Sequence, residues 1–328
     1  MVFTVSPVCD NPTPICIYLG ISRDTFNQFG ERNCRKRNRP DGVRPIAKID
    51  LVMWTLNGES TLAKCLASVE KAVPTEAICH RYLVDGGSTD GTREIGEGLG
   101  WTVVHAHRRG IPYQANQALG LVDTELFSSF EQDIGLNPAW FGSVMTALLS
   151  DPHVAVAQGL RAASGSRYLE AIDNYGVRHG LVPRWIYSID NNLYRTEALR
   201  SVGGFPLDCA MSADGAMRNN LFRDGWKWRV CRDVVSLHYR DSFVKHLRHV
   251  VIQSAENKVL WETYPEYRIP DKLGRVVATP LTSARMASEA QTPGVFFAYP
   301  LFRAVRILSR MIGSMSKQYR FMEVRSQQ

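Results

Sequence analysis

The feature that most constrains the fold is an alternation of strand-like and helix-like segments between residues 46 and 130. Buried strands are expected at four apolar runs, namely 47–55, 78–84, 102–105 and 126–130. Apolar residues at helical spacing follow the first run, with Ser60 or Thr61 as the expected cap, and a second helix is expected at 111–121. This alternation predicts an α/β fold, a doubly wound and mostly parallel sheet flanked by helices.

Charge is distributed unevenly and suggests how the chain is divided. The net charge of +7 consists of +3 in residues 1–45, −3 in 46–267 and +7 in 268–328. Prolines break any long element in the first segment. We therefore expect a basic N-terminal arm at 1–45, a central domain at 46–240 and a helical C-terminal extension at 241–328. Because the net excess of basic residues lies in the two tails and the body is slightly acidic, we expect no nucleic-acid partner.

The C-terminal extension contains a strongly apolar stretch from Phe296 to Met315, with arginines at steps of three to four residues. We expect an amphipathic basic helix, bounded by Pro293 and Pro300, that makes peripheral contact with an anionic membrane. The alternative, a helix packed on the body or in a dimer, is equally open.

The cellular compartment is indicated by the cysteines and the N-terminus. The seven cysteines are scattered and contain no CxxC pair, which favours reduced thiols. A basic segment followed by an apolar one, as in a signal peptide, is missing from the N-terminus, and no run of 18 apolar residues occurs. We expect a cytoplasmic protein, located at the inner face of the membrane if the C-terminal helix binds lipid.

Three polar clusters follow predicted strands, at 55–59, 85–92 and 131–133. In doubly wound sheets ligands bind outside the carboxyl ends of the strands, so these clusters should converge on one cleft. Glu131 and Asp133 would suit a hard divalent cation such as Mn²⁺ or Mg²⁺, although Glu131 alone is also typical of a solvated turn. Asp85 could accept hydrogen bonds from a base or ribose, or the cluster could be only a capped strand-to-helix turn.

Taken in order, the motifs resemble family-2 glycosyltransferases of the GT-A fold. The resemblance covers roughly residues 46–240, which would then be the catalytic domain. It rests on Trp54–Glu59, the stretch Asp85-Gly86-Gly87-Ser88-Thr89-Asp90-Gly91-Thr92, Gly110 with Asn116, Glu131-Gln132-Asp133, Asp190–Arg195 with Val202–Phe205, and Ala213-Asp214 with His238.

The resemblance implies roles for single residues. Thr55, Asn57, Glu59, Asp85, Asn116, Glu131 and Gln132 would bind the nucleotide-sugar. Asp133 would hold the divalent metal, with Glu131 and His238 as further ligands, and Asp214 would be the catalytic base. The chain departs from the family pattern at Trp54 (usually proline), Glu131 (usually aspartate), Ala213 (usually an acid) and Gly86 (usually an acid).

The expected function is therefore that of an inverting hexosyltransferase. It would move a sugar from UDP or GDP to an acceptor hydroxyl or a lipid phosphate, on a glycan or lipid-linked acceptor. The main alternative is a catalytically inactive nucleotide-sugar-binding protein, which the retention of Asp133 and Asp214 disfavours. A nucleotidyltransferase would need a basic, glycine-rich loop after the first strand, and 55–61 has one glycine and no basic residue.

Overall fold

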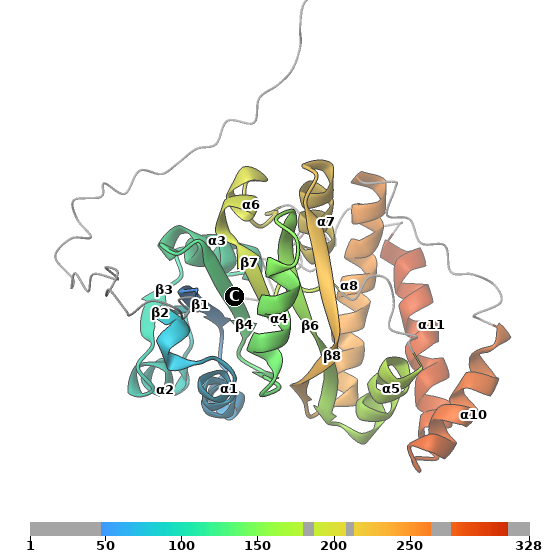
Figure 1. Ribbon diagram of the computed structural model, residues 1–328. Helices are drawn as coiled ribbons and strands as arrows, with labels where there is room; N and C mark the ends of the chain where they lie inside the picture. The colour runs from blue at the N-terminus through green and yellow to red at the C-terminus, as the bar shows by residue number, and fades with distance from the viewer. Residues whose placement is uncertain (1–46, 180–186, 208–212, 264–276, 314–328) are drawn as a thin grey trace, which may run out of the picture. The chain divides into compact units, whose positions relative to one another are not determined.

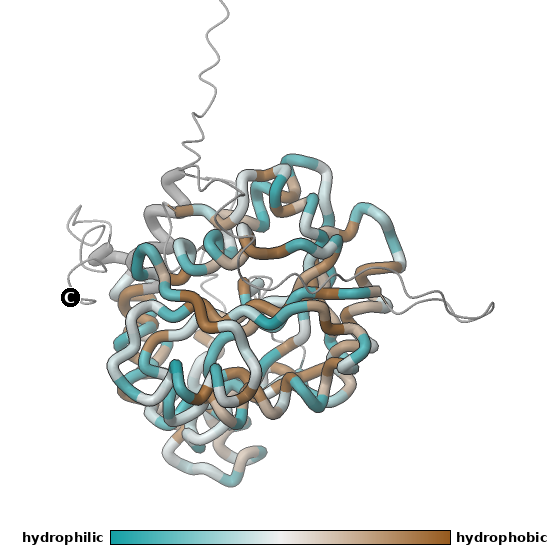
Figure 2. The backbone as a smooth tube through the Cα atoms, turned by 90° about the vertical axis from the view of Figure 1, so that its left-hand side faces the viewer, coloured by the Kyte–Doolittle hydropathy of each residue, from teal (hydrophilic) through white to brown (hydrophobic). Residues whose placement is uncertain are grey.

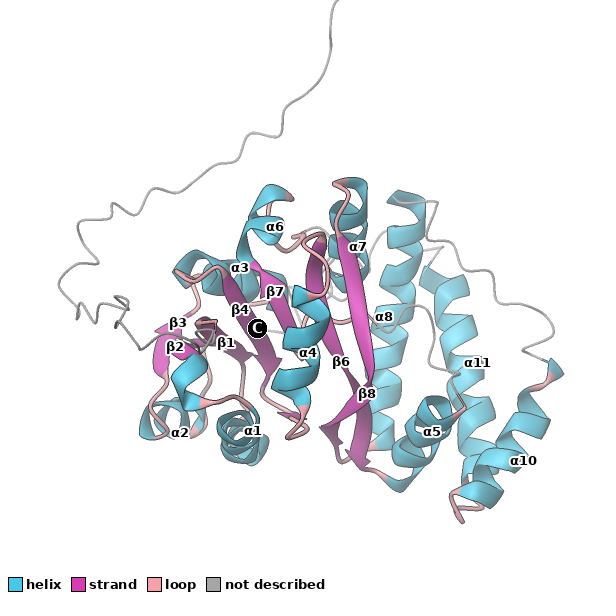
Figure 3. Ribbon diagram, in the orientation of Figure 1, coloured by secondary structure: helices cyan, strands magenta, loops and turns pink. Residues whose placement is uncertain are grey.

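The central element of the fold is an eight-stranded sheet with the strand order β3-β2-β1-β4-β7-β6-β8-β5 (Figures 1 and 3). A computed structural model describes residues 47–179, 187–207, 213–263 and 277–313. Its strands are β1 Ile49–Thr55, β2 Ile78–Asp85, β3 Thr102–His105, β4 Leu126–Glu131, β5 Ile134–Gly135, β6 Val154–Gly165, β7 Asn192–Arg195 and β8 Lys227–Arg240. Strands β1 to β4 pair in parallel, as do β6 and β8, whereas β7 and β5 pair antiparallel to their neighbours. The predicted mostly parallel sheet is thus confirmed.

Helices cover both faces of the sheet (Figure 1). They are α1 Glu59–Ala72, α2 Thr92–Gly98, α3 Ile111–Leu121, α4 Trp140–Leu149, α5 Arg167–Arg178, α6 Thr196–Ser201, α7 Ala213–Arg223, α8 Phe243–Thr263, α10 Thr279–Glu289 and α11 Val295–Gly313, with a short 3₁₀ turn at Thr75–Ala77. The described residues all belong to one compact unit, Arg44–Gln328.

Side-chain alternation along β1 explains why two hydrophobic cores form. Ile49, Leu51 and Met53 point to one face and pack with α1 and α4. Val52 and Trp54 point to the other face and pack with α3, α6 and α7. Apolar side chains therefore fill the space between the sheet and its covering helices on both faces, and Figure 2 shows hydrophobic stretches (brown) alternating with hydrophilic ones (teal) along the chain.

The start of α1 differs from the prediction. Neither Ser60 nor Thr61 caps the helix, which begins after Gly58 without a side-chain cap of its own. Instead, Gly58 N donates to Thr92 Oγ1 at 2.8 Å and Glu59 N donates to Asp90 Oδ2 at 3.2 Å. The residues after β2 thus supply the hydrogen-bond acceptors at the start of α1, in place of the predicted cap by Ser60 or Thr61.

The C-terminal extension is helical, as expected, but Pro300 lies inside α11 instead of bounding it. Proline removes one backbone hydrogen bond, which this helix tolerates because it packs along α8 and α10 (Figure 1). A small third core joins Ala171 and Tyr175 of α5 to Met286 of α10 and Val295 of α11. None of the helices within the described ranges combines the length and apolar character that crossing a bilayer requires.

Candidate active site

A pocket of about 300 Å³ lies at the carboxyl ends of β4 and β8 and beside the starts of α7 and α8. It is lined by acidic residues from the end of β4, the turn after it, the start of α7 and the loop after β8, by basic residues from β6, β8 and α8, and by a few other residues: Glu131, Asp133, Asp214, Asp241, Arg161, Arg240, Lys245, His238, His246, His249, Ile111, Ser188, Ile189, Ala213, Tyr239 and Ser242. The pocket contains the residues assigned to metal binding and to catalysis, whereas the clusters 55–59 and 85–92, which were expected in the same cleft, are not among its lining residues.

Glu131, Asp133 and His238 come together although more than 100 residues separate the two acids from the histidine. Strand β4 ends at Glu131, and the short strand β5 that follows pairs with β8, which sets Ile134 opposite His238. Tyr239 N donates to Asp133 O at 2.8 Å and fixes the same junction. One ligand atom from each of the three side chains lies within 4.8 Å of the others. This pairing brings the predicted metal ligands to one point.

The electrostatics of the three side chains favour a cation between them. Burial and the negative charges of Asp190 and Asp133 raise the pKa of Glu131 well above its ordinary value. Burial also opposes ionisation of Asp133, but a hydrogen bond from His238 and the charges of Arg240 and Arg161 hold its pKa below the ordinary value. Burial and Arg240 lower the pKa of His238 to about 4, so the imidazole is neutral and able to ligate metal. A divalent cation would relieve the repulsion between the two carboxylates, so this donor set fits Mn²⁺ or Mg²⁺.

Two departures from the family pattern meet at Glu131. The indole Nε1 of Trp54, which stands where the family usually has proline, donates to Glu131 Oε1 at 3.4 Å. The longer side chain of glutamate, in place of aspartate, is thus held on the β1 side while it remains within reach of Asp133 and His238. Trp54 therefore positions one of the candidate ligands.

Asp214 occupies the first turn of α7 and lines the same pocket. Gly215 N donates to its Oδ1 at 2.7 Å. Burial raises the pKa of Asp214 to about 6, against the opposing effects of that hydrogen bond and of Arg161. A carboxyl group with a pKa near the working pH can accept a proton and still be largely ionised, which suits a general base.

Several pocket residues were not predicted from the sequence. Arg161 of β6 forms an ion pair with buried Asp190. Arg240, at the end of β8, donates from Nε to His238 and from Nη1 to His246 Nδ1. The spacing of His246 and His249, three residues apart on one helix, is a signal that could have placed both on one face of α8.

The turn after β2, which was predicted to meet the nucleotide, lies outside the lining of this pocket. Asp85 is fully buried, and its carboxylate accepts from Gly87 N at 3.1 Å, from Ser88 N at 3.0 Å and from Thr55 Oγ1 at 3.4 Å, and also from Ser88 Oγ. The guanidinium of Arg109 donates to Gly86 O at 3.0 Å. Gly87 adopts φ +91°, a conformation that glycine reaches without strain. Thr55 and Asp85 thus organise the turn that would face a nucleotide.

The neighbouring predicted residues are also engaged with the backbone. Asn57, at φ 50°, accepts from Thr89 N at 2.9 Å, whereas Glu59 is exposed in the first turn of α1. The amide of Gln132 bonds twice to the backbone of Leu56, at 2.8 and 3.0 Å. Gln132 therefore joins the turn after β4, which contains Asp133, to the loop after β1.

Asn116 lies apart from the pocket lining. Its Nδ2 donates to Pro112 O at 2.9 Å and to Phe205 O at 2.7 Å, and its Oδ1 accepts from Phe205 N at 2.9 Å. A Cβ added to Gly204, which has φ +81°, would lie 2.3 Å from Asn116 Oδ1. Asn116 thus ties α3 to the turn after α6, a structural contact that occupies its polar atoms.

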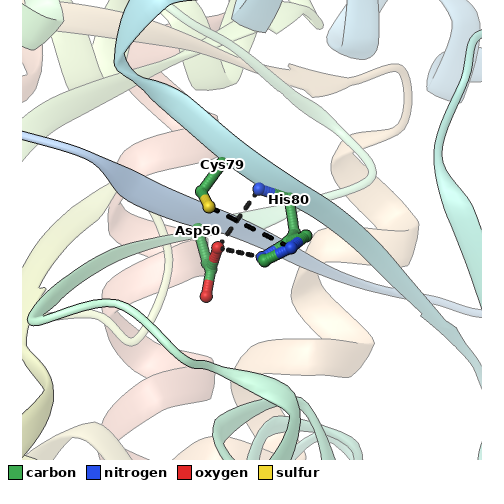
Figure 4. Close-up of side chains that lie close together, drawn as sticks. All are labelled: Asp50, Cys79 and His80. Atoms are coloured by element: carbon green, nitrogen blue, oxygen red, sulfur yellow. Dashed lines mark hydrogen bonds and ion pairs between the residues drawn. The ribbon is translucent and has the colours of Figure 1, made fainter. Parts of the chain in front are cut away.

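A second group of possible metal ligands, Asp50, Cys79 and His80, lies elsewhere, on the adjacent strands β1 and β2 (Figure 4). The Asp50 carboxylate already accepts from His80 N at 3.1 Å, His80 Nδ1 at 2.8 Å, Asp123 N at 2.8 Å and Thr124 N at 3.3 Å. These four donors match the number of lone-pair sites of a carboxylate. Asp50 therefore links β1, β2 and the segment before β4, and we assign the group a structural role.

Comparisons with known proteins identify the family of the central domain and the fold. Residues 50–211 match the model of glycosyl transferase family 2. A mannosyltransferase from Pyrobaculum calidifontis, solved with GDP-mannose and Mn²⁺, aligns with a TM-score of 0.53 at 16% identity over 84% of this chain and 77% of that one. A glucosyl-3-phosphoglycerate synthase from Mycobacterium tuberculosis, solved with Mn²⁺, UDP and its product, aligns with a TM-score of 0.49 at 17% identity over 72% and 88%. A comparison with curated protein sequences gave no significant match.

Proposed function

Because the chain contains a glycosyl transferase family 2 domain of the GT-A fold, we propose that it is an inverting hexosyltransferase that uses a UDP- or GDP-linked donor. The observation that carries this proposal is the convergence of Glu131, Asp133 and His238 with Asp214 in one pocket. A metal-ligand set beside a carboxyl group with a raised pKa is an arrangement that group transfer from a diphosphate requires.

Asp214 is the proposed base. Its carboxylate takes the proton of the acceptor hydroxyl as the acceptor oxygen bonds to the anomeric carbon and the bond from that carbon to the diphosphate oxygen breaks. A single displacement of this kind inverts the anomeric centre. Glu131, Asp133 and His238 would hold Mn²⁺ or Mg²⁺, which when bound neutralises charge on the leaving diphosphate.

The nucleotide would lie towards the turn after β2. Thr55, Asn57, Glu59 and Asp85 come from this end of the sheet, and we propose that they bind the base and ribose through their side chains or through the backbone they order. Gln132 and Asn116 would act indirectly, since their amides already bond to the protein backbone. The division into an arm at 1–45, a catalytic domain at 46–240 and an extension at 241–328 remains part of the proposal.

Release of free nucleoside diphosphate tests the reaction. UDP- and GDP-sugars would be screened with Mn²⁺, Mg²⁺ or chelator, in the presence of a pool of glycan and lipid-linked acceptors. We expect metal-dependent release from one donor and a loss of about 10²- to 10⁴-fold in Asp214→Asn. The control is Asp224→Asn, in which the exposed acid after α7 is changed. Metal-dependent nucleotide binding without any turnover would favour the alternative, an inactive nucleotide-sugar-binding protein.

We also propose that α11 contacts an anionic membrane, which would place the protein in the cytoplasm at the inner face. Phe296, Phe297, Leu301 and Leu308 are exposed on this helix, and Arg303 and Arg306 lie among them. Full-length protein should sediment with vesicles that contain anionic lipid, less so at high salt. Equal sedimentation with neutral vesicles, or none with either, would contradict this contact.

A further inference from the structure

Four nitrogen-bearing side chains lie on one wall of the pocket, two of them formal cations, Arg240 and Lys245, and two of them neutral imidazoles, His246 and His249. Arg240 is at the end of β8, and Lys245, His246 and His249 follow in the first turns of α8. The acids Glu131, Asp133 and Asp214 come instead from β4, its following turn and α7. The fourth acid of the lining, Asp241, follows Arg240 and lies 3.4 Å from Lys245. We call Arg240, Lys245, His246 and His249 the basic wall.

Arg240 is the central group of the basic wall. Within the described ranges no carboxylate pairs with it, and its Nε and Nη1 donate to the histidines His238 and His246. In contrast, Arg161 has an acidic partner, Asp190. A partly buried guanidinium without its own counter-ion is stabilised when an anion binds.

The other members of the wall are also donors. Because His246 Nδ1 accepts from Arg240, its Nε2 carries the ring hydrogen. The ring is held in place by stacking on Phe302 of α11, with centroids 5.7 Å apart and planes 6° apart. Lys245 pairs with Asp241 only at 3.4 Å and both side chains are more than 70% exposed, so this ion pair is weak and the ammonium can turn to a ligand.

The position of the wall distinguishes it from the nucleotide end. The turn that would face the nucleotide follows β2, whereas the wall follows β8, and β1, β4, β7 and β6 lie between them in the sheet. Asp214 and the metal-ligand set line the same pocket as the wall, and His238 accepts from Arg240 Nε at 3.2 Å. Because the wall follows β8 and not β2, a group bound there would belong to the molecule opposite the nucleotide, namely the acceptor.

We infer that the basic wall of Arg240, Lys245, His246 and His249 is a subsite for a phosphate group carried by the acceptor. The inference rests on the proposed transferase function and names the class of its second substrate. A phosphate ester carries about −1.5 to −2 charges at neutral pH and has three acceptor oxygens, which matches two formal cations and several N–H donors better than a single carboxylate does. The source of the phosphate is either a soluble phosphate ester or a lipid-linked phosphate.

Calorimetric titration of the full chain with inorganic phosphate tests the subsite, with Mg²⁺ and saturating nucleoside diphosphate present. We expect phosphate to bind while the nucleotide is bound, and Arg240→Gln to weaken phosphate binding at least tenfold. Arg240→Lys should retain part of the affinity because it keeps the charge. The matched control is Arg229→Gln, an exposed arginine on the same strand that is not in the pocket lining.

Some results would contradict the proposed phosphate subsite and leave the proposed transferase function untouched. If phosphate bound only when nucleotide was absent, the wall would serve the diphosphate of the donor. Equal phosphate affinity in wild type and Arg240→Gln would likewise overturn it. Metal-dependent nucleotide binding is measured separately, and its failure would instead contradict the proposed function.

Turnover then identifies the source of the phosphate. Pairs of acceptors that differ in one phosphate would be compared, an alcohol with its monophosphate ester and a short polyprenol with its phosphate. In at least one pair the phosphorylated member should have a KM at least tenfold lower, and Arg240→Gln should remove most of that difference. Equal use of the two members in both pairs would overturn the assignment to the acceptor.

Discussion

At the scale of single residues, burial makes Asp214 a group that titrates within the range of ordinary assays. Its pKa is raised to about 6, and only the ionised form can take a proton from the acceptor. We therefore expect kcat/KM to be constant above about pH 7 and to fall roughly tenfold per unit well below pH 6. The measurement is nucleoside diphosphate release from pH 4.5 to 8.5 at saturating metal.

Loss of the metal at low pH would produce a similar decline, so nucleotide binding must be followed over the same range. If binding persists where turnover fails, the titrating group is the base. Turnover that stays constant down to pH 5 would show that Asp214 is not the proton acceptor.

For Asn116, the role implied by the family resemblance differs from the role indicated by its contacts. The resemblance suggests nucleotide binding, but the side chain makes three hydrogen bonds to the backbone at Pro112 and Phe205. We expect Asn116→Ala to lower the free energy of unfolding by about 1–3 kcal/mol, because Phe205 N and O lose their partner. The folded variant should bind nucleoside diphosphate within about twofold of wild type. Urea unfolding and calorimetry measure the two quantities, and a much weaker nucleotide affinity with unchanged stability would restore the binding role.

At the scale of elements, the sequence was most informative where the pattern was regular. Strands β1 to β4 and helices α1 and α3 were predicted because each is a single apolar or amphipathic segment with turn residues on either side. Strand β8 was not, since charged residues such as Arg229 and Asp233 interrupt its apolar positions. The metal and base residues followed from motifs, but Arg161, Arg240 and His246 did not. They meet only through packing of β6, β8 and α8, which no local pattern contains.

The packing of α11 on α8 links the C-terminal extension to the pocket. Phe302 stacks on His246, which belongs to the basic wall. We expect Phe302→Ala to weaken inorganic phosphate binding about threefold to tenfold, the equivalent of an aromatic contact of roughly 0.5–1.5 kcal/mol. Phe297→Ala is the control, because this side chain of the same helix is 75% exposed. Equal effects of both variants would mean that α11 does not support the wall.

At the scale of the whole molecule, the proposed metal site would couple metal binding to stability. Glu131 and Asp133 repel each other, and a cation bound to the folded chain shifts the folding equilibrium by mass action. At about 100 times its dissociation constant, a metal that binds only the folded state adds roughly 2.7 kcal/mol. Thermal unfolding with increasing Mn²⁺ should therefore show a rising midpoint, and Asp133→Asn should remove most of the rise.

Nucleoside diphosphate provides the second part of this test. If its phosphates complete the coordination of the cation, metal and nucleotide together should raise the midpoint by more than the sum of their separate effects. Asp224→Asn, which changes an acid remote from the pocket, should behave as wild type. A midpoint that rises equally in wild type and Asp133→Asn would mean that Mn²⁺ stabilises the fold at another place, and the set of Glu131, Asp133 and His238 would no longer account for metal dependence.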